Sequence, residues 1–120
     1  MFDDPDAALA RVQADIRAAQ ERAEQAADFQ EVVGRVRGHA RSPRGEVTVE
    51  VDTTGQLVNL QLADAATDIV ARDLSGLILD TVRAAAKDAA RQTLAVTAET
   101  FGEQSPVTGA MRAELAPRLG

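Results

Sequence analysis

Apolar residues recur with helical spacing between residues 6 and 33. They are separated by three or four positions and fall at Leu9, Val12, Ile16, Ala19, Ala23 and Ala26. This heptad-like spacing predicts an amphipathic helix of about 25 residues, roughly 38 Å long. Asp4 followed by Pro5 marks its start, because an aspartate side chain caps free backbone amides and proline fits the first helical turn.

Two interpretations of this apolar stripe are open on the sequence alone. The helix can be an ordinary amphipathic element that packs on its own sheet. It is also longer than a small domain needs, so part of the stripe can contact another chain. Both arrangements can hold along different stretches of the helix.

After Gly34 the apolar residues fall at every second position, which is typical of strands with one buried face. Three alternating segments follow, separated by two turn signals, in the order 35–41, Ser42–Gly45, 47–52, Thr53–Gly55 and 58–62. Proline, glycine and serine are favoured in such turns because they fit the backbone angles that turns require. The pattern predicts a three-stranded antiparallel meander.

A second long helix is predicted from about Asp68 to Phe101. Its apolar positions have helical spacing and include Leu74, Leu77, Ile78, Val82, Ala85, Ala86 and Ala89. Gly102 suits the end of a helix, and the prolines and glycines beyond it predict a tail of low order. We therefore expect an α+β fold with the order helix, meander, helix. One domain would span residues 1–102, followed by a flexible C-terminal tail at 103–120.

A two-residue turn at Pro43-Arg44 would fix the register of the first two strands. By counting, it places Arg41 opposite Glu46, Arg37 opposite Glu50 and Arg35 opposite Asp52. Opposite charges that face each other support this register, and each such pair contributes about 0.2–1 kcal/mol. One interpretation of these arginines is therefore purely structural.

The other interpretation is a strip of basic residues that contacts phosphate groups. Its members are Arg35, Arg37, His39, Arg41 and Arg44. Arg11, Arg17 and Arg22 on the first helix are secondary candidates for the same contacts. No aromatic residues interleave with the strip, so stacking on single-stranded nucleic acid is not expected.

Composition adds a reason to expect two subunits. The 120 residues fit one domain, but 24 of them are alanine, and there is no tryptophan or tyrosine and only three phenylalanines. Alanine buries little apolar area, so the core is thin. A thin core in a short chain favours a second subunit that covers more apolar surface.

The net charge of −6 has the wrong sign for a general polyanion binder, but the charge is unevenly distributed. Residues 31–45 carry four arginines against Glu31 alone. This segment is the one basic island of the sequence, so any contact with nucleic acid is expected there.

No catalytic, cofactor or metal site is expected. The chain has no cysteine, a single histidine at His39, and no glycine-rich loop that could hold a phosphate. An enzyme is therefore not expected. No run of 18 apolar residues exists, and the acidic start lacks the basic region of a secretory signal, so we expect a cytoplasmic location without a membrane partner.

Two segments carry a resemblance to a known family. One is the strand block Gly45–Asp52, followed by Gly55 and the strand Val58–Leu62. The other is Ala85–Arg91 in the second helix. Together they resemble the YbaB/EbfC family of bacterial nucleoid-associated proteins. The second segment is similar to the family's Asn-Asp-Ala helix segment, with Lys87 where asparagine is usual.

The resemblance implies a homodimer formed around the sheets, with long helices that project like tweezers. It also implies binding of double-stranded DNA with low sequence specificity, and a role in nucleoid organisation or gene regulation. An alternative stays open, because a related acidic subgroup associated with specialised secretion systems shares this fold. For that subgroup the resemblance implies a protein-interaction adaptor that does not bind DNA.

Overall fold

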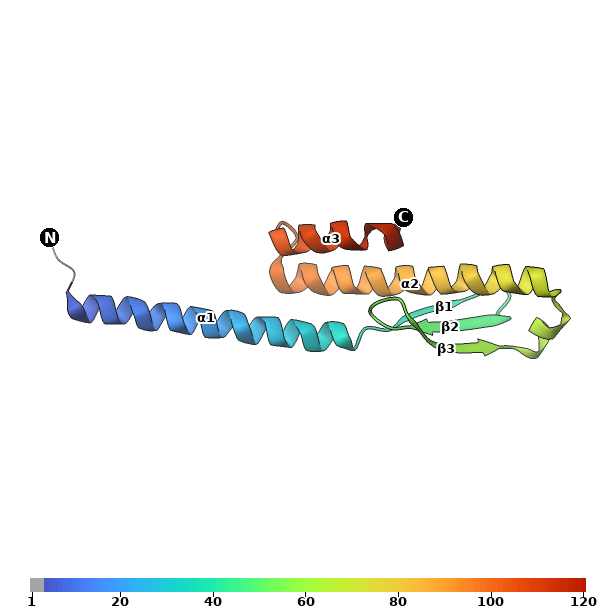
Figure 1. The fold of residues 1–120 in the computed structure, drawn as a ribbon, viewed down its shortest axis with the longest axis horizontal. Helices are drawn as coiled ribbons and strands as arrows, with labels where there is room; N and C mark the ends of the chain where they lie inside the picture. Colours follow the sequence, from blue (N-terminus) through green and yellow to red (C-terminus); the bar gives the residue numbers. More distant parts are fainter. Residues whose placement is uncertain (1–3) are drawn as a thin grey trace.

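The protomer is elongated, with extents of 83 × 22 × 16 Å, and its described residues combine three α-helices and a short 3-10 helix with one three-stranded sheet (Figure 1). A computed structural model of the protein describes residues 4–120. Residues 1–3 lie outside the described residues, and so does the part of the acidic start, weighed against a secretory signal, that falls on them. The elements in chain order are α1 (Pro5–Gly34), β1 (Gly38–Arg41), β2 (Val47–Val51), β3 (Leu57–Leu62), the 3-10 helix η1 (Asp64–Asp68), α2 (Ala71–Phe101) and α3 (Pro106–Leu119). The expected α+β fold class is confirmed.

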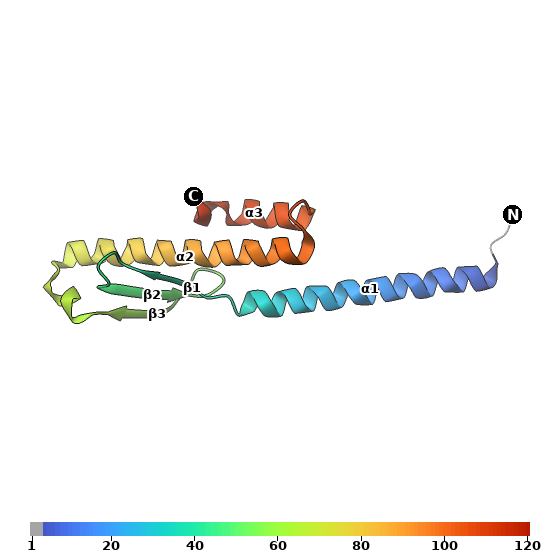
Figure 2. The ribbon, with the colours of Figure 1, turned by 180° about the vertical axis from the view of Figure 1, so that it is seen from behind.

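Helix α1 projects away from the sheet (Figure 2). It starts as predicted, because the Asp4 carboxylate accepts a hydrogen bond from the Asp6 amide at 3.1 Å and Pro5 occupies the first turn. None of its described residues is buried. The interpretation in which the helix packs on its own sheet is therefore wrong. The physical reason is that α2 already covers the apolar face of the sheet.

The core lies between α2 and the first two strands. Val47, Val49 and Val51 on β2 are at most 1% exposed, and Ala85 and Ala89 on α2 are fully buried. These small helix residues let the strands come close, as expected for a thin core rich in alanine.

Gly38 marks the closest approach between β1 and α2. A Cβ atom at this position would lie 2.8 Å from the Cβ of Ala89 and would clash with the carbonyl oxygen of Ala85. Any side chain here would push the strand off the helix, because the neighbouring atoms are the backbone and the Cβ of residues in the middle of α2. Gly38 therefore determines how closely β1 packs against α2.

The register between β1 and β2 differs by two residues from the predicted one. His39 lies opposite Glu50 and Arg41 lies opposite Thr48. The cause is the turn, where the Ser42 carbonyl accepts the Gly45 amide at 2.9 Å and the Ser42 hydroxyl accepts the Val47 amide at 2.9 Å. Because the shift is an even number of residues, every side chain keeps its predicted face.

The turn between β2 and β3 is built around Asp52. One carboxylate oxygen of Asp52 accepts three hydrogen bonds, from the Thr54 amide at 2.9 Å, the Thr54 hydroxyl at 2.6 Å and the Gln56 amide at 3.0 Å. Gly55 follows with φ of 87°, a left-handed conformation that glycine adopts without strain. These bonds lower the pKa of Asp52, with the Thr54 hydroxyl as the largest cause.

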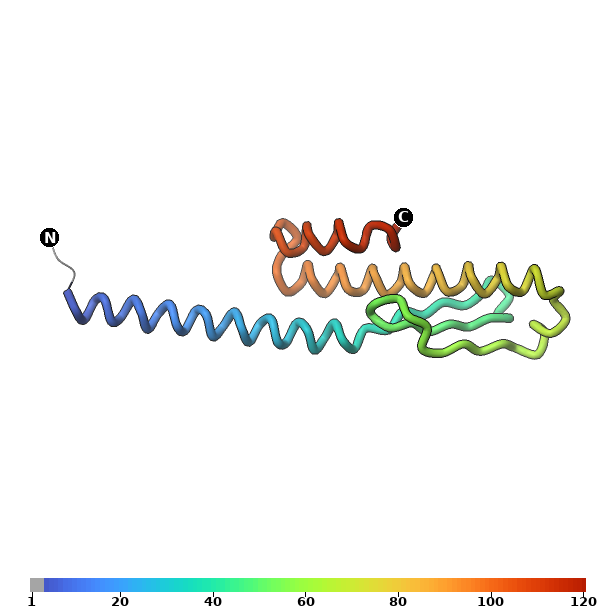
Figure 3. The backbone as a smooth tube through the Cα atoms, in the orientation of Figure 1, coloured from blue at the N-terminus to red at the C-terminus, as the bar shows by residue number. Residues whose placement is uncertain are grey.

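The segment after Gly102 contains a helix, so the predicted tail of low order is wrong for residues 106–119. Helix α3 folds back along α2 (Figure 3), with Thr108 fully buried and Leu115 2% exposed. It starts as α1 does, with a capping Ser105 and a proline in the first turn, Pro106. A serine followed by proline can break a chain or start a helix, and Ser105-Pro106 starts a helix, as Asp4-Pro5 does in α1. The domain boundary at residue 102 stays a prediction.

Substitution of Gly38 tests the close approach of β1 and α2. We expect Gly38→Ala to lower the free energy of unfolding by about 1–3 kcal/mol, because the added methyl group has no space. Gly76→Ala is the matched control, since nothing lies within 4 Å of a Cβ at that helical position. It should be neutral or raise stability by up to about 1 kcal/mol. Chemical denaturation of both variants measures the difference, and equal stabilities would contradict the packing described here.

The Asp52 turn predicts an acid-dependent loss of stability. Because the folded state lowers the pKa of Asp52, the contribution is complete above the unfolded pKa and is lost as the pH falls through the folded one. The free energy of unfolding of the native chain should therefore drop more steeply below about pH 4 than that of Asp52→Asn, whose side chain does not titrate. Denaturation curves across acidic pH make the comparison. Parallel pH profiles for the two proteins would show that the carboxylate is not stabilised by this turn.

Candidate nucleic-acid interface

Strand β1 forms one edge of the sheet and is fastened to α2 by two polar side chains. The carboxylate of Asp88 accepts the backbone amide of His39 at 2.8 Å, and Gln92 donates to the carbonyl oxygen of Arg37 at 2.8 Å. Gln92 also donates to Asp88 at 3.0 Å, which ties the two together. Asp88 belongs to the helix segment that carried the family resemblance, and its observed role is to hold the edge strand.

Two side chains at the start of β1, those of Arg37 and His39, already share one carboxylate partner. The guanidinium of Arg37 lies 3.8 Å from Glu50, and the imidazole of His39 lies 3.6 Å from the same carboxylate. Arg37 also donates to the carbonyl oxygens of Gly34 at 3.1 Å and Val36 at 2.8 Å. The predicted ion pair between Arg37 and Glu50 is thus present, and Arg37 also fixes the junction between α1 and β1.

Arg35 takes a different partner from the predicted one. It ends α1 and lies 3.0 Å from Glu31, one helical turn earlier, rather than opposite Asp52. The two side chains are 67% and 69% exposed, so this pair contributes little to stability. Arg35 therefore lies at the edge of the basic strip and can exchange its partner at small cost.

Arg41 and Arg44 gather at the tip of the first hairpin. In the described part of the chain neither forms an ion pair, and both are exposed. Gly45 makes room for the guanidinium of Arg41, since a Cβ there would lie 2.8 Å from Nε, and its φ of 79° also requires glycine. We call Arg37, His39, Arg41 and Arg44 the hairpin cluster.

Glu46 is the acidic neighbour within the turn itself. Its pKa lies below the ordinary value, chiefly because its own backbone amide donates to the carboxylate, with the Ser42 hydroxyl and the charge of Arg44 as further causes. Ser42 donates this bond at 3.0 Å and is only 5% exposed. Glu46 is therefore held by Ser42, which leaves the guanidinium groups of the turn open to solvent.

The secondary candidates Arg11, Arg17 and Arg22 are all exposed on α1. Because α1 projects away from the sheet and the hairpin tip lies near the start of α2, one protomer does not bring these arginines together with the hairpin cluster (Figure 1). The eight predicted residues therefore form two separate groups.

A further basic surface was not predicted. Arg83 and Lys87 on α2 and Arg118 on α3 line a groove of about 440 Å³. Arg118 is fixed there because it donates to the carbonyl oxygen of Thr53 at 3.1 Å. The spacing of Arg83 and Lys87, one helical turn apart, was visible in the sequence. The contribution of Arg118 was not, because it depends on the return of α3.

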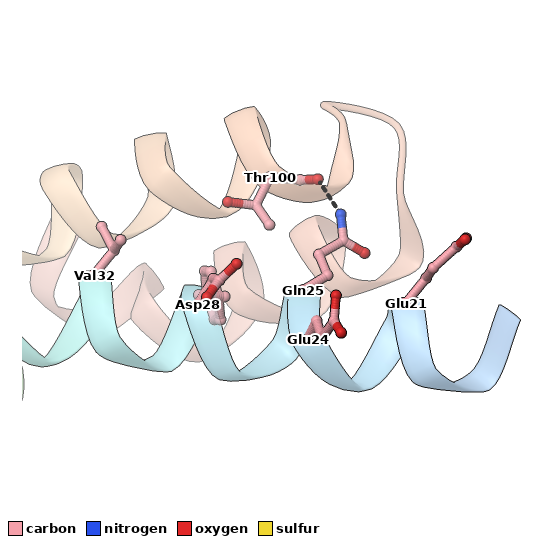
Figure 4. Close-up of a pocket in the computed structure, with 7 residues that line it drawn as sticks. Glu21, Glu24, Gln25, Asp28, Val32 and Thr100 are labelled. Atoms are coloured by element: carbon pink, nitrogen blue, oxygen red, sulfur yellow. Dashed lines mark hydrogen bonds between the residues drawn. The ribbon is translucent and has the colours of Figure 1, made fainter. Parts of the chain in front are cut away.

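The cleft between α1 and the end of α2 has the opposite character. Its walls carry the carboxylates of Glu21, Glu24 and Asp28, and Gln25 donates across it to the carbonyl oxygen of Thr100 at 3.0 Å (Figure 4). These charges repel phosphate groups. Within residues 4–120 no group of histidine, cysteine and carboxylate side chains is arranged to hold a metal ion.

Comparisons with known proteins agree with these observations. None of the helices in residues 4–120 combines the length and apolarity that a membrane crossing requires. A search of curated proteins found no match. The model of the YbaB/EbfC DNA-binding family matches residues 9–104, about four fifths of the chain. That family is non-enzymatic, and membership suggests nucleoid-associated DNA binding. The chain therefore belongs to the YbaB/EbfC DNA-binding family.

Proposed function

We propose that this chain binds double-stranded DNA with low sequence specificity, as a homodimer, in the nucleoid of a bacterial cytoplasm. It contributes there to nucleoid organisation or gene regulation. The observation that carries the proposal is the pair of exposed arginines at the hairpin tip, Arg41 and Arg44, which have no ion-pair partner among the described residues. Family membership supports the same class of ligand.

The contacts are to phosphate rather than to bases. Arginine suits phosphate because its planar guanidinium donates two parallel hydrogen bonds. A short turn that carries two arginines reaches the backbone of a duplex, but it offers no basic helix that could lie in the major groove and read bases. Low sequence specificity follows from this arrangement. The groove lined by Arg83, Lys87 and Arg118 is a second candidate for phosphate contact.

The proposed dimer uses the uncovered face of β3. Helix α2 packs on β1 and β2, and the apolar side chains of β3 remain 38–52% exposed, at Leu57, Val58, Leu60 and Leu62. A contiguous row of exposed aliphatic residues on a sheet edge favours a partner subunit. A second copy there would double the number of arginines offered to one duplex.

The β3 face predicts how the dimer is broken. Leu60 lies opposite Val49 and therefore shares the apolar face, whereas Gln61 lies opposite Thr48 on the other face. Leu60→Glu should convert the dimer to a monomer, because it buries an unpaired charge in the interface. Gln61→Glu, with a similar charge on the other side of the same strand, should leave the dimer intact. Sedimentation equilibrium measures both masses, and an undiminished mass for Leu60→Glu would place the dimer contact elsewhere.

The hairpin tip predicts the salt dependence of DNA binding. If a dimer neutralises about six phosphates, log affinity falls with log salt with a slope near −5. Arg41→Gln with Arg44→Gln removes four charges per dimer, so affinity should fall for all duplex sequences alike and the slope should become shallower by about 3–4. Mobility shifts on unrelated duplexes at several salt concentrations give both quantities. Arg37 is left in place because it also fixes the junction between α1 and β1.

The matched control for the hairpin tip is Arg72→Gln with Arg91→Gln. Both residues are exposed and lie outside the hairpin cluster, and this double variant changes the net charge by the same amount. Its affinity and salt slope should stay close to those of the native chain. Equal losses in the two double variants would mean that only net charge matters, and an unchanged hairpin variant would move the contact to another surface.

A protein-interaction adaptor of the same fold is the second candidate function. It is favoured by the net charge of −6 and by the ion pairs that already occupy Arg35 and Arg37. A pull-down after nuclease treatment separates the two functions. Recovery of one protein in stoichiometric amount, together with no shift of duplex DNA at low salt, would favour the adaptor.

A further inference from the structure

The apolar stripe of α1 faces solvent along its length. Leu9, Val12 and Ile16 are 56%, 52% and 53% exposed, and the alanines at positions 19, 23 and 26 are exposed as well. The contacts of α1 with α2 fall near the end of α1, at Gln25 (Figure 4), which lies well off the stripe, and at Phe29, which lies on its flank. No described segment of the chain covers this α1 stripe.

The side chains of the α1 stripe are large in its N-terminal half and small in its C-terminal half, which contains only alanines. An antiparallel second copy of α1 places the large half of each helix against the small half of the other. The layers are Leu9 with Ala26, Val12 with Ala23 and Ile16 with Ala19, each made twice by symmetry. Every layer then pairs one large side chain with one alanine. The distance between the two helix axes therefore stays nearly constant, in the usual range of about 8–10 Å. A parallel pair would set large against large and small against small, and its width would change along the seam.

The polar residues beside the stripe match in the same register. In an antiparallel pair, each residue that flanks the seam faces the equivalent heptad position of the other helix. Asp15 then faces Arg22 of the second copy, and symmetry repeats this ion pair. On the other flank Gln13 faces Gln20 of the second copy. In a parallel pair Asp15 would face Gln20 instead, and no flanking ion pair would form.

The length of α1 also fits this register. Pro5 lies level with Gln30 of the second copy, so the start of each helix stops short of the sheet of the other. Helix α2 contacts α1 at Gln25 and Phe29, and the stripe itself stays exposed and available to the second helix.

We propose that the α1 stripe is an interface between two copies of this chain, whose α1 helices pair antiparallel in this register. The interface is separate from the β3 face. Used together, the two interfaces join dimers into assemblies larger than a dimer. Two dimers that each bind DNA would thereby be held together, with Arg22 engaged by Asp15 rather than by phosphate.

Thiol cross-linking tests the orientation directly, because the chain contains no cysteine. Full-length Val12→Cys and Ala23→Cys are mixed and treated with a short bismaleimide cross-linker. The mixture should form covalent pairs several-fold faster than either variant alone. Ala14→Cys mixed with Glu21→Cys is the control, since these residues lie at the same level but on the outer side of the helix, and it should not exceed its own single variants. Equal cross-linking in the Val12→Cys sample alone would indicate a parallel pair and overturn the proposal.

Charge reversal tests the flanking ion pair. Asp15→Arg and Arg22→Asp each place like charges opposite one another twice, so each should weaken self-association above the dimer by about five- to thirtyfold at low salt. The chain with both substitutions should recover native association, because it restores the pair with its polarity reversed. Sedimentation equilibrium measures the self-association of the native chain, the two single variants and the double variant. A native chain that never exceeds a dimer, or a double variant as weak as the singles, would overturn the proposal.

Neither measurement involves DNA. A chain that assembles through α1 but does not shift duplex DNA would contradict only the proposed function, and a chain that binds DNA as a simple dimer would contradict only the α1 interface.

Discussion

The close contact of β1 with α2 is the constraint on which the rest of the structure depends. Gly38 has no side chain, and Ala85 and Ala89 have the smallest, so strand and helix approach until a single added carbon would clash. Asp88 and Gln92 then reach the strand and take up hydrogen bonds along its edge. With one face packed and one edge bonded to the helix, the strand can turn its remaining polar face only toward solvent. The position of every arginine in the hairpin cluster follows from that seating.

The packing of β1 against α2 explains how an acidic chain can present a basic surface. Carboxylates line α1 and the cleft beside it, whereas Arg41 and Arg44 at the hairpin tip have no ion-pair partner among residues 4–120, and the nearby Glu46 is held by Ser42. Electrostatic interactions between exposed charges fade within about 10 Å at ordinary salt, so a phosphate at the hairpin tip responds mainly to the local arginines. Net charge therefore limits affinity and tunes its salt dependence, but it does not decide which surface a polyanion contacts.

Much of this architecture could be predicted from the sequence, and the errors have identifiable causes. The helix start at Asp4-Pro5 and the faces of the strands followed from local chemistry and period. The register was wrong by two residues because Ser42 pairs with Val47 rather than with Gly45: its amide donates to the Val47 carbonyl oxygen and its hydroxyl accepts the Val47 amide, so the loop holds four residues instead of two. Helix α3 was missed because Ser105-Pro106 is both a helix start and a chain breaker. For the candidate site, the sequence predicts only a strip of basic residues and not which of them are free to bind phosphate. Which arginines are already paired depends on the register, and the basic groove depends on where α3 returns.

The most direct measurement is to follow the side chain Nε–Hε resonances of the arginines by NMR while duplex DNA is added to the labelled, full-length chain at low salt. The hairpin cluster predicts large shifts for Arg41 and Arg44, smaller ones for Arg37, whose guanidinium is already partnered, and reversal of these shifts when salt is raised. If the resonances of Arg41 and Arg44 stay in place while those of other residues shift, DNA does not bind at the hairpin tip, and the account is contradicted.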